Sequence, residues 1–342
     1  MHTMDTTISQ AAVVLFIALL TYYLALHPQK SALSSFPGPY RYRISPIPYY
    51  ISTLRGTSHT HLLDLHRKHG PIIRITPNQL SYATTSAWTD IWSHRPEFTK
   101  PIPPPVNGVQ GILGASSGNH RKYRRAFAYA FSAQGLREQQ PMIDRYIGLL
   151  MEGLEKYGTV DLVQWFQWTT FDLIGDLAFG ADFGCLENAR THPWIADISG
   201  NLVSSVWLIA AGALGVLGVV RPFMPGRLKR AREENWRFVV ERVATRCRMG
   251  SDRGDFFDRI VASRDSERGM TIEEMESNAL NLVLAGSETS ATMLSGTTAL
   301  LLLHPEYLAK LTKDLRETFA SVSDITIEAC AKNLLLLGKS LA

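Results

Sequence analysis

The segment from Thr271 to Leu303 constrains the fold more than any other part of the sequence. Thr271 and Glu274 have the spacing of a capping box, which begins a helix. Pro305 ends it, because proline disfavours helical backbone in the preceding residue. A helix of this length is about 48 Å long. From Ala279 to Leu303 it is apolar nearly all round, so we expect it to run through the middle of its domain.

A polar notch interrupts this apolar helix at Gly286 to Ser290. Glu288 is the only charge between Ala279 and Leu303, and burying an ionisable group is costly unless it is paired or functional. Gly286 lets another group approach the backbone, and the neighbouring hydroxyls can bond to helical carbonyls and bend the helix. These residues alone leave two interpretations: a binding groove beside the helix, or a satisfied polar network where helices pack.

The rest of the body is predicted to be mainly α, with a small N-terminal β-sheet. Ile72 to Ile75 predicts a strand, and Pro77-Asn78 turns the chain into a partner strand around Leu80 and Tyr82. Periodic apolar positions predict further helices at Asn119–Phe131, Pro141–Tyr157, Asp161–Phe179, Pro225–Met249 and Pro305–Phe319.

The N-terminus carries a targeting signal. Ala11 to Leu26 is uncharged and slightly shorter than the roughly 20 residues that span a bilayer. No Lys or Arg precedes it, as a cleaved signal peptide would require, so we expect residues 1–30 to be a retained membrane anchor. Lys30, Arg41 and Arg43 follow the run, which places the body in the cytosol.

The prolines from Pro37 to Pro48 predict a stiff, non-helical hinge at residues 31–56, ahead of a globular domain at residues 57–332. Within that domain, Ile198 to Val220 contains no charged residue. We favour a buried or membrane-dipping helix pair for this stretch, and a second membrane span is the alternative.

Composition excludes several functions. The net charge of +4 comes from 35 basic and 31 acidic residues, a balance too even for a nucleic-acid binder. The three cysteines form no CxxC pair, so neither a disulfide framework nor a cysteine zinc site is predicted, and a reducing compartment fits best.

A basic segment contains a candidate anion site. His120 and Arg124 lie one helical turn apart, so both can face one anionic group, and Arg124 is the stronger candidate. The alternative is a solvated basic face that also includes Arg121, Lys122 and Arg125.

The chain resembles the cytochrome P-450 family at the polar notch. The central helix of that family carries an Ala/Gly-Gly-x-Asp/Glu-Thr-Thr/Ser signature, which Ala285 to Ser290 meets at every position. The likeness extends over nearly the whole chain up to about Lys332, including the anchor, Pro37-Gly38-Pro39, His69 to Asn78, and His304-Pro305-Glu306. Within the family, the sequence most resembles the microsomal enzymes that fungi use in secondary metabolism, including at His120 to Phe127.

The resemblance implies a cytochrome P-450 fold and a haem-dependent monooxygenase that inserts one atom of O2 into a lipophilic small molecule. Thr289 would be the hydrogen-bond donor of the oxygen pocket, and Glu288 would help to deliver protons. Ala285 and Gly286 would lie against the haem face.

The resemblance further implies that His120 and Arg124 hold a haem propionate. Electrons would come from NADPH-cytochrome P-450 reductase. The protein would be a single-pass protein of the endoplasmic reticulum membrane, with its body facing the cytosol.

The C-terminal part departs from the family pattern. In the family, the stretch equivalent to Ile325 to Lys332 leads to a Glu-x-x-Arg helix and then to a cysteine whose thiolate binds the iron, and neither follows here. Cys330 lies outside such a loop, so no metal ligand is predicted, and residues 333–342 form a divergent tail. We therefore expect a C-terminally truncated chain that is inactive alone; the alternative is a non-catalytic membrane-bound remnant that acts as a binding or interaction protein.

Overall fold

The computed structural model describes residues 32–100, 102, 106–216, 218, 226–264, 266, 269–330 and 332. The predicted anchor at residues 1–30 and the predicted tail at residues 333–342 lie outside this part. Within it, no helix combines the length and the apolar character needed to cross a bilayer. The chain divides into two compact units, one from Met1–Phe98 with Ser199–Leu228 and one from Thr99–Ile198 with Lys229–Ala342.

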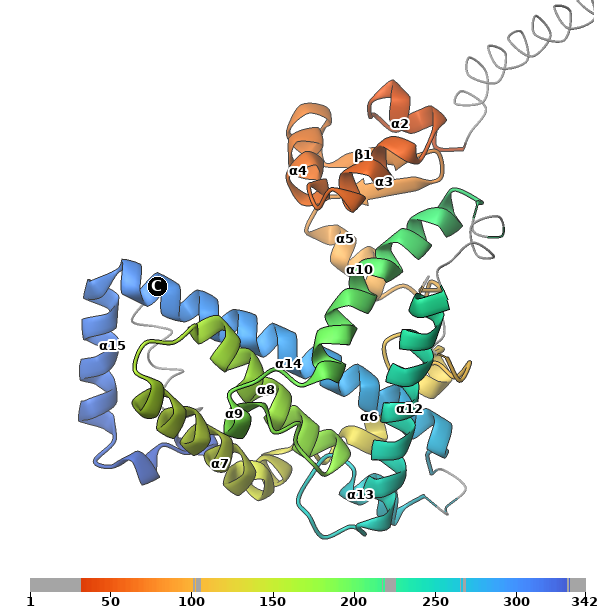
Figure 1. The fold of residues 1–342 in the computed structure, drawn as a ribbon. Helices are drawn as coiled ribbons and strands as arrows, with labels where there is room; N and C mark the ends of the chain where they lie inside the picture. Colours follow the sequence, from red (N-terminus) through yellow and green to blue (C-terminus); the bar gives the residue numbers. More distant parts are fainter. Residues whose placement is uncertain are drawn as a thin grey trace, which may run out of the picture. The chain divides into compact units, whose positions relative to one another are not determined.

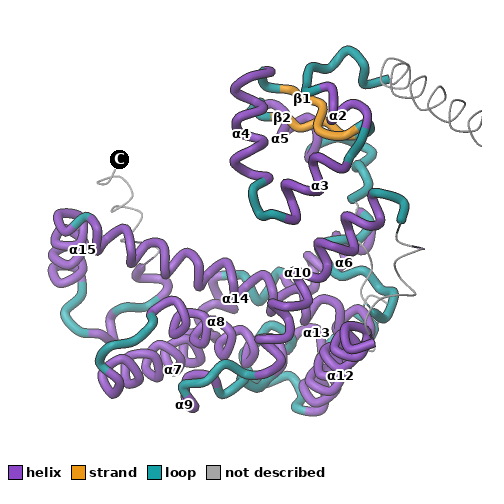
Figure 2. Tube along the Cα trace, turned by 45° about the horizontal axis from the view of Figure 1, so that its top comes forward, coloured by secondary structure: helices purple, strands orange, loops and turns teal. Residues whose placement is uncertain are grey.

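The first unit contains the predicted hairpin. Strands β1 (Ile72–Thr76) and β2 (Gln79–Tyr82) pair antiparallel, with Ile72 opposite Tyr82. Helices α2 (Tyr40–Ile44), α3 (Ile47–Leu54) and α4 (Ser58–His69) accompany the strands (Figure 2). The small core consists of Tyr42, Leu65, Ile73 and Ile75.

The prediction of a non-helical hinge is wrong for residues 40–44 and 47–54, which form α2 and α3. Pro46 is the N-cap of α3 and Pro48 lies in its first turn. The first N–H groups of a helix have no intrahelical acceptor, so a proline costs no hydrogen bond there. Prolines that suggested a spacer therefore sit at helix starts.

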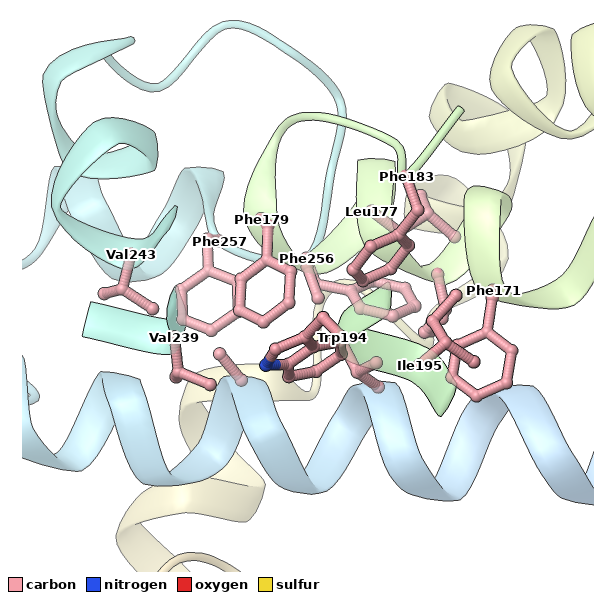
Figure 3. Close-up of a cluster of buried hydrophobic side chains, with 14 of the residues drawn as sticks. Phe171, Leu177, Phe179, Phe183, Trp194, Ile195, Val239, Val243, Phe256 and Phe257 are labelled. Carbon is pink, nitrogen blue, oxygen red and sulfur yellow. The ribbon is translucent and has the colours of Figure 1, made fainter. Parts of the chain in front are cut away.

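The second unit is helical (Figure 1). Its elements are α6 (Ser117–Phe127), α7 (Ala133–Tyr157), α8 (Leu162–Phe179), α9 (Cys185–Asn188), α13 (Asp258–Ala262), α14 (Ile272–Leu303) and α15 (Pro305–Thr318). α14 packs mainly against α8. The core is rich in aromatic rings, among them Phe179, Phe183 and Trp194 (Figure 3).

Two helices belong partly to each unit: α10 (Pro193–Ala213) and α12 (Gly226–Arg248). α10 covers the uncharged stretch Ile198–Val220 from Ile198 to Ala213, and Gly215, which follows it, adopts a left-handed conformation (φ 71°). Residues 217, 219 and 220 lie outside the described part, so the helix pair stays a prediction. Further elements are α5 (Ser86–Trp92) and the 3-10 turn η2 (Val322–Asp324).

The helix starts predicted at Pro225 and Pro305 are confirmed within one residue, since α12 begins at Gly226 and α15 at Pro305, but the start predicted at Pro141 is wrong. α7 begins at Ala133 and contains Pro141, because the Ser132 hydroxyl accepts a hydrogen bond from Gly135 N and starts the helix earlier. The capping box of α14 is confirmed: Glu274 N donates to the Thr271 hydroxyl at 3.2 Å, and Thr271 N donates to the Glu274 carboxylate at 2.9 Å.

The expectation that α14 is buried all round is wrong for its C-terminal half. Ala279, Val283 and Ala291 are buried, whereas Met293 is 66% exposed and Leu303 is 74% exposed. Apolar character does not place a residue inside unless another element covers it. Among the described residues, α8 covers one side of α14 only, so the other side stays open.

Candidate functional site

The polar notch of α14 divides between two sides of the helix. Ala285 and Thr289 are exposed, whereas Ser287 is buried. A Cβ atom added to Gly286 would lie 2.8 Å from Ile174 Cδ1, so this glycine allows α8 to approach α14 closely. The helix-packing interpretation therefore holds for Gly286 and Ser287, and the open face carries Ala285 and Thr289.

The hydroxyls of the notch bond to helical carbonyls, as predicted. Thr289 Oγ1 donates to Ala285 O at 2.6 Å, and Ser287 Oγ donates to Val283 O at 2.6 Å. α14 nevertheless runs without a break from Ile272 to Leu303. A hydroxyl has a single proton, so Thr289 must leave Ala285 O before it can donate to any other group.

Glu288 is half-buried, and its carboxylate has no hydrogen bond or ion pair with any described residue. Partial exposure explains how an unpaired charge is tolerated in an apolar helix, because water still solvates it. An open groove of about 250 Å³ lies further along, between α8 and α14, lined by Val163, Gln167, Ala291, Thr292, Ser295 and Gly296. This groove includes neither Glu288 nor Thr289.

Helix α6 holds the predicted anion site. His120 is half-buried and Arg124 is exposed, and neither has an acidic partner in the described part of the chain. No hydrogen bond or ion pair joins either residue to Ala285 or Thr289 in that part. The anion site at His120 and Arg124, and its nearness to the open face of α14, stay predictions.

The same helix is tied to the N-terminal end of α14. Lys122 forms an ion pair with Glu274 at 2.6 Å, and the buried Tyr123 donates to Glu274 at 3.1 Å. Burial alone would raise the pKa of Glu274, but hydrogen bonds from Lys122, the Thr271 backbone and Tyr123 outweigh it and hold that pKa below its ordinary value. The expectation that Lys122 lies in water is therefore wrong.

A loop that the sequence argument did not place also rests on α14. Asn107 Nδ2 donates to Glu273 O at 3.0 Å and to Glu276 at 3.3 Å, and Ile112 N donates to Asn278 Oδ1 at 2.8 Å. Glu276 is buried, and burial raises its pKa. Asparagines within an apolar helix were the available signal for this contact.

A second network missed by the sequence argument joins α12 to α8. Arg246 is buried and binds Asp255 through two hydrogen bonds, at 2.6 and 2.8 Å, while Arg253 binds Asp176 at 2.6 Å. A Cβ atom at Gly180 would lie 2.7 Å from Arg246 Cδ, so the glycine makes room for the arginine. These contacts are structural, because every acid in them is paired.

The described cysteines differ in their surroundings. Cys185 is fully buried, and burial, with Asp172 next to it, raises the pKa of its thiol to about 12. Cys330 lies in a helical turn, where its N–H donates to Thr326 O at 2.8 Å. Within the described ranges no cluster of three or more His, Cys, Asp or Glu side chains could hold a metal ion. The small, exposed Ala285 beside Thr289 leaves room for a flat group on this face of α14, and the haem contacts of Ala285, His120 and Arg124 stay predictions.

Comparison with known proteins places these residues in a family context. A profile of the family described as Cytochrome P-450 matches residues 43–339. The chain is 43% identical over 317 residues to averantin hydroxylase of Dothistroma septosporum, covering 91% of this chain and 60% of the relative. It is 43% identical over 323 residues to averantin hydroxylase of Aspergillus parasiticus, covering 92% and 64%.

A third relative is versicolorin B desaturase of Dothistroma septosporum, which is 36% identical over 329 residues, covering 92% of this chain and 62% of the relative. The chain thus spans less than two thirds of the length of each of these three curated relatives.

Proposed function

Because the chain belongs to the cytochrome P-450 family, we propose that the protein is a haem-dependent monooxygenase that inserts one atom of O2 into a lipophilic small molecule. Two relatives carry averantin and versicolorin B in their names. Molecules of that kind are the first substrate candidates, in a pathway of secondary metabolism.

The observation that carries the proposal is the open face of α14, where the small Ala285 and the hydroxyl of Thr289 are exposed one turn apart. Small side chains there leave room for a flat macrocycle, whereas a larger side chain at Ala285 would clash with it. We propose that Ala285 forms the haem side of this face, whereas the predicted haem contact of Gly286 is replaced by its packing against Ile174 of α8. His120 and Arg124 would hold a propionate through charge-assisted hydrogen bonds.

Haem, when bound, supplies the redox-active iron at which O2 is reduced. We assign the proton chemistry to the chain itself. Thr289 rotates its hydroxyl away from Ala285 O and donates the proton into the pocket. Once it carries a proton again, the hydroxyl bonds to Ala285 O as before. The half-buried carboxylate of Glu288 takes a proton from water and replaces the proton that Thr289 has donated.

Haem binding tests this proposal directly. The full chain is produced with a haem precursor in the medium, purified in detergent, reduced under carbon monoxide and examined by absorption spectroscopy. We expect bound haem, and weaker binding in Arg124→Ala, while Arg121→Ala serves as a matched control on the same helix. Absence of haem from the purified chain would overturn the assignment of the α14 face.

The second candidate is a non-catalytic, membrane-bound binding protein. It is favoured by the full burial of Cys185, which raises the pKa of its thiol and keeps the thiol protonated. The position of the carbon monoxide band separates the two functions. A red-shifted Soret band indicates thiolate ligation and supports the monooxygenase, and haem bound without that band supports the second candidate.

We also propose that residues 1–30 anchor the protein in the endoplasmic reticulum membrane, with the body in the cytosol and NADPH-cytochrome P-450 reductase as the electron donor. The uncharged run from Ala11 to Leu26 and the basic residues after it support this topology. Protease treatment of sealed microsomes is the test. The region after Val220 should be digested without detergent; protection of that region would favour a second span.

A further inference from the structure

Arg242 of α12 is a half-buried arginine whose guanidinium forms no hydrogen bond or ion pair with any residue that the structure describes. It lies over aromatic rings instead, with Cζ 4.9 Å from the ring centroid of Phe238 and 5.9 Å from that of Phe183. Burial lowers its pKa, and the charge of Asp182 offsets only part of that effect. A partly desolvated charge without a hydrogen-bonding partner costs free energy, and a bound anion removes that cost.

The acidic group nearest in effect, Asp182, is occupied elsewhere. Its carboxylate accepts a hydrogen bond from the Tyr146 hydroxyl at 2.9 Å and forms an ion pair with Arg145 at 3.4 Å. The N–H groups of Arg242 therefore keep their capacity to donate. None of its nitrogens is among the buried, unpaired nitrogens of the described residues, so solvent and a dissolved ligand can reach the guanidinium.

His192 lies against the same two rings as Arg242. The centroid of its imidazole is 5.5 Å from that of Phe183 and 5.6 Å from that of Phe238. Burial and the charge of Arg242 lower the pKa of His192, so the ring is mainly neutral at neutral pH. Nδ1 accepts a hydrogen bond from Trp194 N at 3.2 Å, which places the single ring proton on Nε2. This Nε2–H is a second donor without an acceptor in the described part of the chain.

The segment at residues 180–192, between α8 and α10, is fixed before any ligand arrives. The buried carboxylate of Asp172 accepts hydrogen bonds from the backbone N–H groups of Phe183, Cys185 and Leu186, at 3.1, 3.1 and 2.8 Å. Phe183 also stacks on Trp194, with ring centroids 5.3 Å apart (Figure 3). A site whose walls are already ordered loses less conformational entropy when it binds.

We propose that Arg242 and His192 form a binding site for the carboxylate of a small acid with an apolar body. The planar guanidinium matches the two oxygens of a carboxylate. Phe238, which is only partly buried, offers its ring to the apolar body. The negative charge of Asp182 repels a phosphate dianion more strongly than a carboxylate, which carries one charge. The site lies outside α14, so it goes beyond the proposed function.

The test compares 2-naphthoate with the uncharged 2-naphthamide by calorimetric titration of the full chain at a fixed detergent concentration. The wild type should bind 2-naphthoate more tightly. Arg242→Met keeps an apolar chain over the rings and removes the charge, so it should weaken the binding of 2-naphthoate by about tenfold or more and leave that of 2-naphthamide unchanged. Equal affinities in the wild type, or an unchanged preference in Arg242→Met, would overturn the proposal.

Matched variants separate the site from general charge and from folding. Arg237→Met removes an exposed charge from the same helix and should leave both affinities unchanged. Arg242→Lys keeps the charge without the planar fork and should bind 2-naphthoate with intermediate affinity. It decides the question if thermal unfolding shows that Arg242→Met is not folded, and wild-type affinity in Arg242→Lys would then contradict the paired contact.

Two further measurements test the second donor and the class of ligand. His192→Phe keeps a flat ring but loses Nε2–H, so the affinity for 2-naphthoate should fall by about fivefold. Full affinity in this variant would overturn the two-donor site. Inorganic phosphate should not displace 2-naphthoate from the wild type at concentrations at which benzoate does. Equal displacement by phosphate would overturn the assignment to carboxylates.

Discussion

The polar N-terminal end of α14 is buried, whereas its apolar C-terminal end is exposed. At its N-terminal end, Glu274, Glu276 and Asn278 are all buried, and each has a hydrogen-bond partner. At its C-terminal end, Leu300 is 60% exposed and Leu303 is 74% exposed. Burial thus follows the availability of a partner surface, and side-chain polarity alone does not decide it.

The N-terminal end of α14 is covered by other elements of the chain, and the C-terminal end is not covered by any described residue on its exposed side. The N-terminal end is covered by α6 and by the loop at residues 106–114, which satisfy its polar groups. The exposed apolar side of the C-terminal end is typical of a surface that a ligand or another polypeptide segment covers. We therefore expect substitutions at the first end to change stability and substitutions at the second to change binding.

Removal of the Glu274 carboxylate should have the largest effect. Glu274→Ala leaves Tyr123 and Lys122 without their acceptor in a largely buried place, so we expect the free energy of unfolding to fall by about 3 kcal/mol. Met293→Ala on the exposed end is the matched control and should change it by less than about 0.5 kcal/mol. Urea denaturation measures both. Similar losses in the two variants would break the comparison.

The glycines of α14 should respond in opposite directions. A Cβ atom at Gly296 meets nothing within 4 Å, so Gly296→Ala should stabilise the protein by about 0.5–1 kcal/mol through lower backbone entropy of the unfolded chain. Gly286→Ala presses on Ile174, and overpacking of about 1 kcal/mol or more should cancel or reverse the gain. Thermal unfolding of both variants, and of the double variant Gly286→Ala with Ile174→Val, measures these changes. If Gly286→Ala stabilised the protein as much as Gly296→Ala, α8 would not be tightly packed there.

The contributions of Glu274 and Glu276 to the free energy of unfolding should depend on pH in opposite directions. The pKa of Glu274 is held below its ordinary value, so its contribution is present above about pH 4.3 and is lost as the pH falls through the folded-state pKa. Burial raises the pKa of Glu276, so its contribution is present below about pH 4.3 and is lost as the pH rises through the folded-state pKa. Denaturation of Glu274→Gln and Glu276→Gln between pH 3 and pH 7, roughly the span of those transitions, should show differences from wild type of opposite slope. Parallel curves would refute the assignment.

Thr289 should matter least for stability. Its hydroxyl is exposed and bonds only to a carbonyl of its own helix, so Thr289→Ala should change the free energy of unfolding by less than about 0.5 kcal/mol. In a chain that turns over with reductase, the same change should lower the product formed per electron consumed and increase peroxide. Unchanged coupling would count against the assigned proton donor.

Local signals in the sequence predicted the elements well where a specific residue starts or ends them. The capping box at Thr271 and Pro305 bound α14, and Asp161 caps α8, with its carboxylate accepting from Val163 N and Gln164 N. Proline predicted the starts of α12 and α15 within one residue but misplaced the start of α7, because Pro141 lies in the interior of that helix.

The candidate site was predicted in part. The sequence singled out Ala285 to Ser290, but periodicity could not tell which of these residues face α8, because that depends on where a distant helix packs. Asn107 and Asn278 were not identified, since their role arises only when a loop more than 160 residues away in the sequence meets α14.

The sequence by itself determined the family, the bounds of α14 and the motif that the helix carries, because capping and helix propensity act within a few residues. The tertiary structure decided which side of α14 is closed. It turned Gly286 towards Ile174, gave Glu274 its partners on α6 and left Thr289 exposed. Burial is a property of contacts between segments far apart in the chain, and no local pattern contains it.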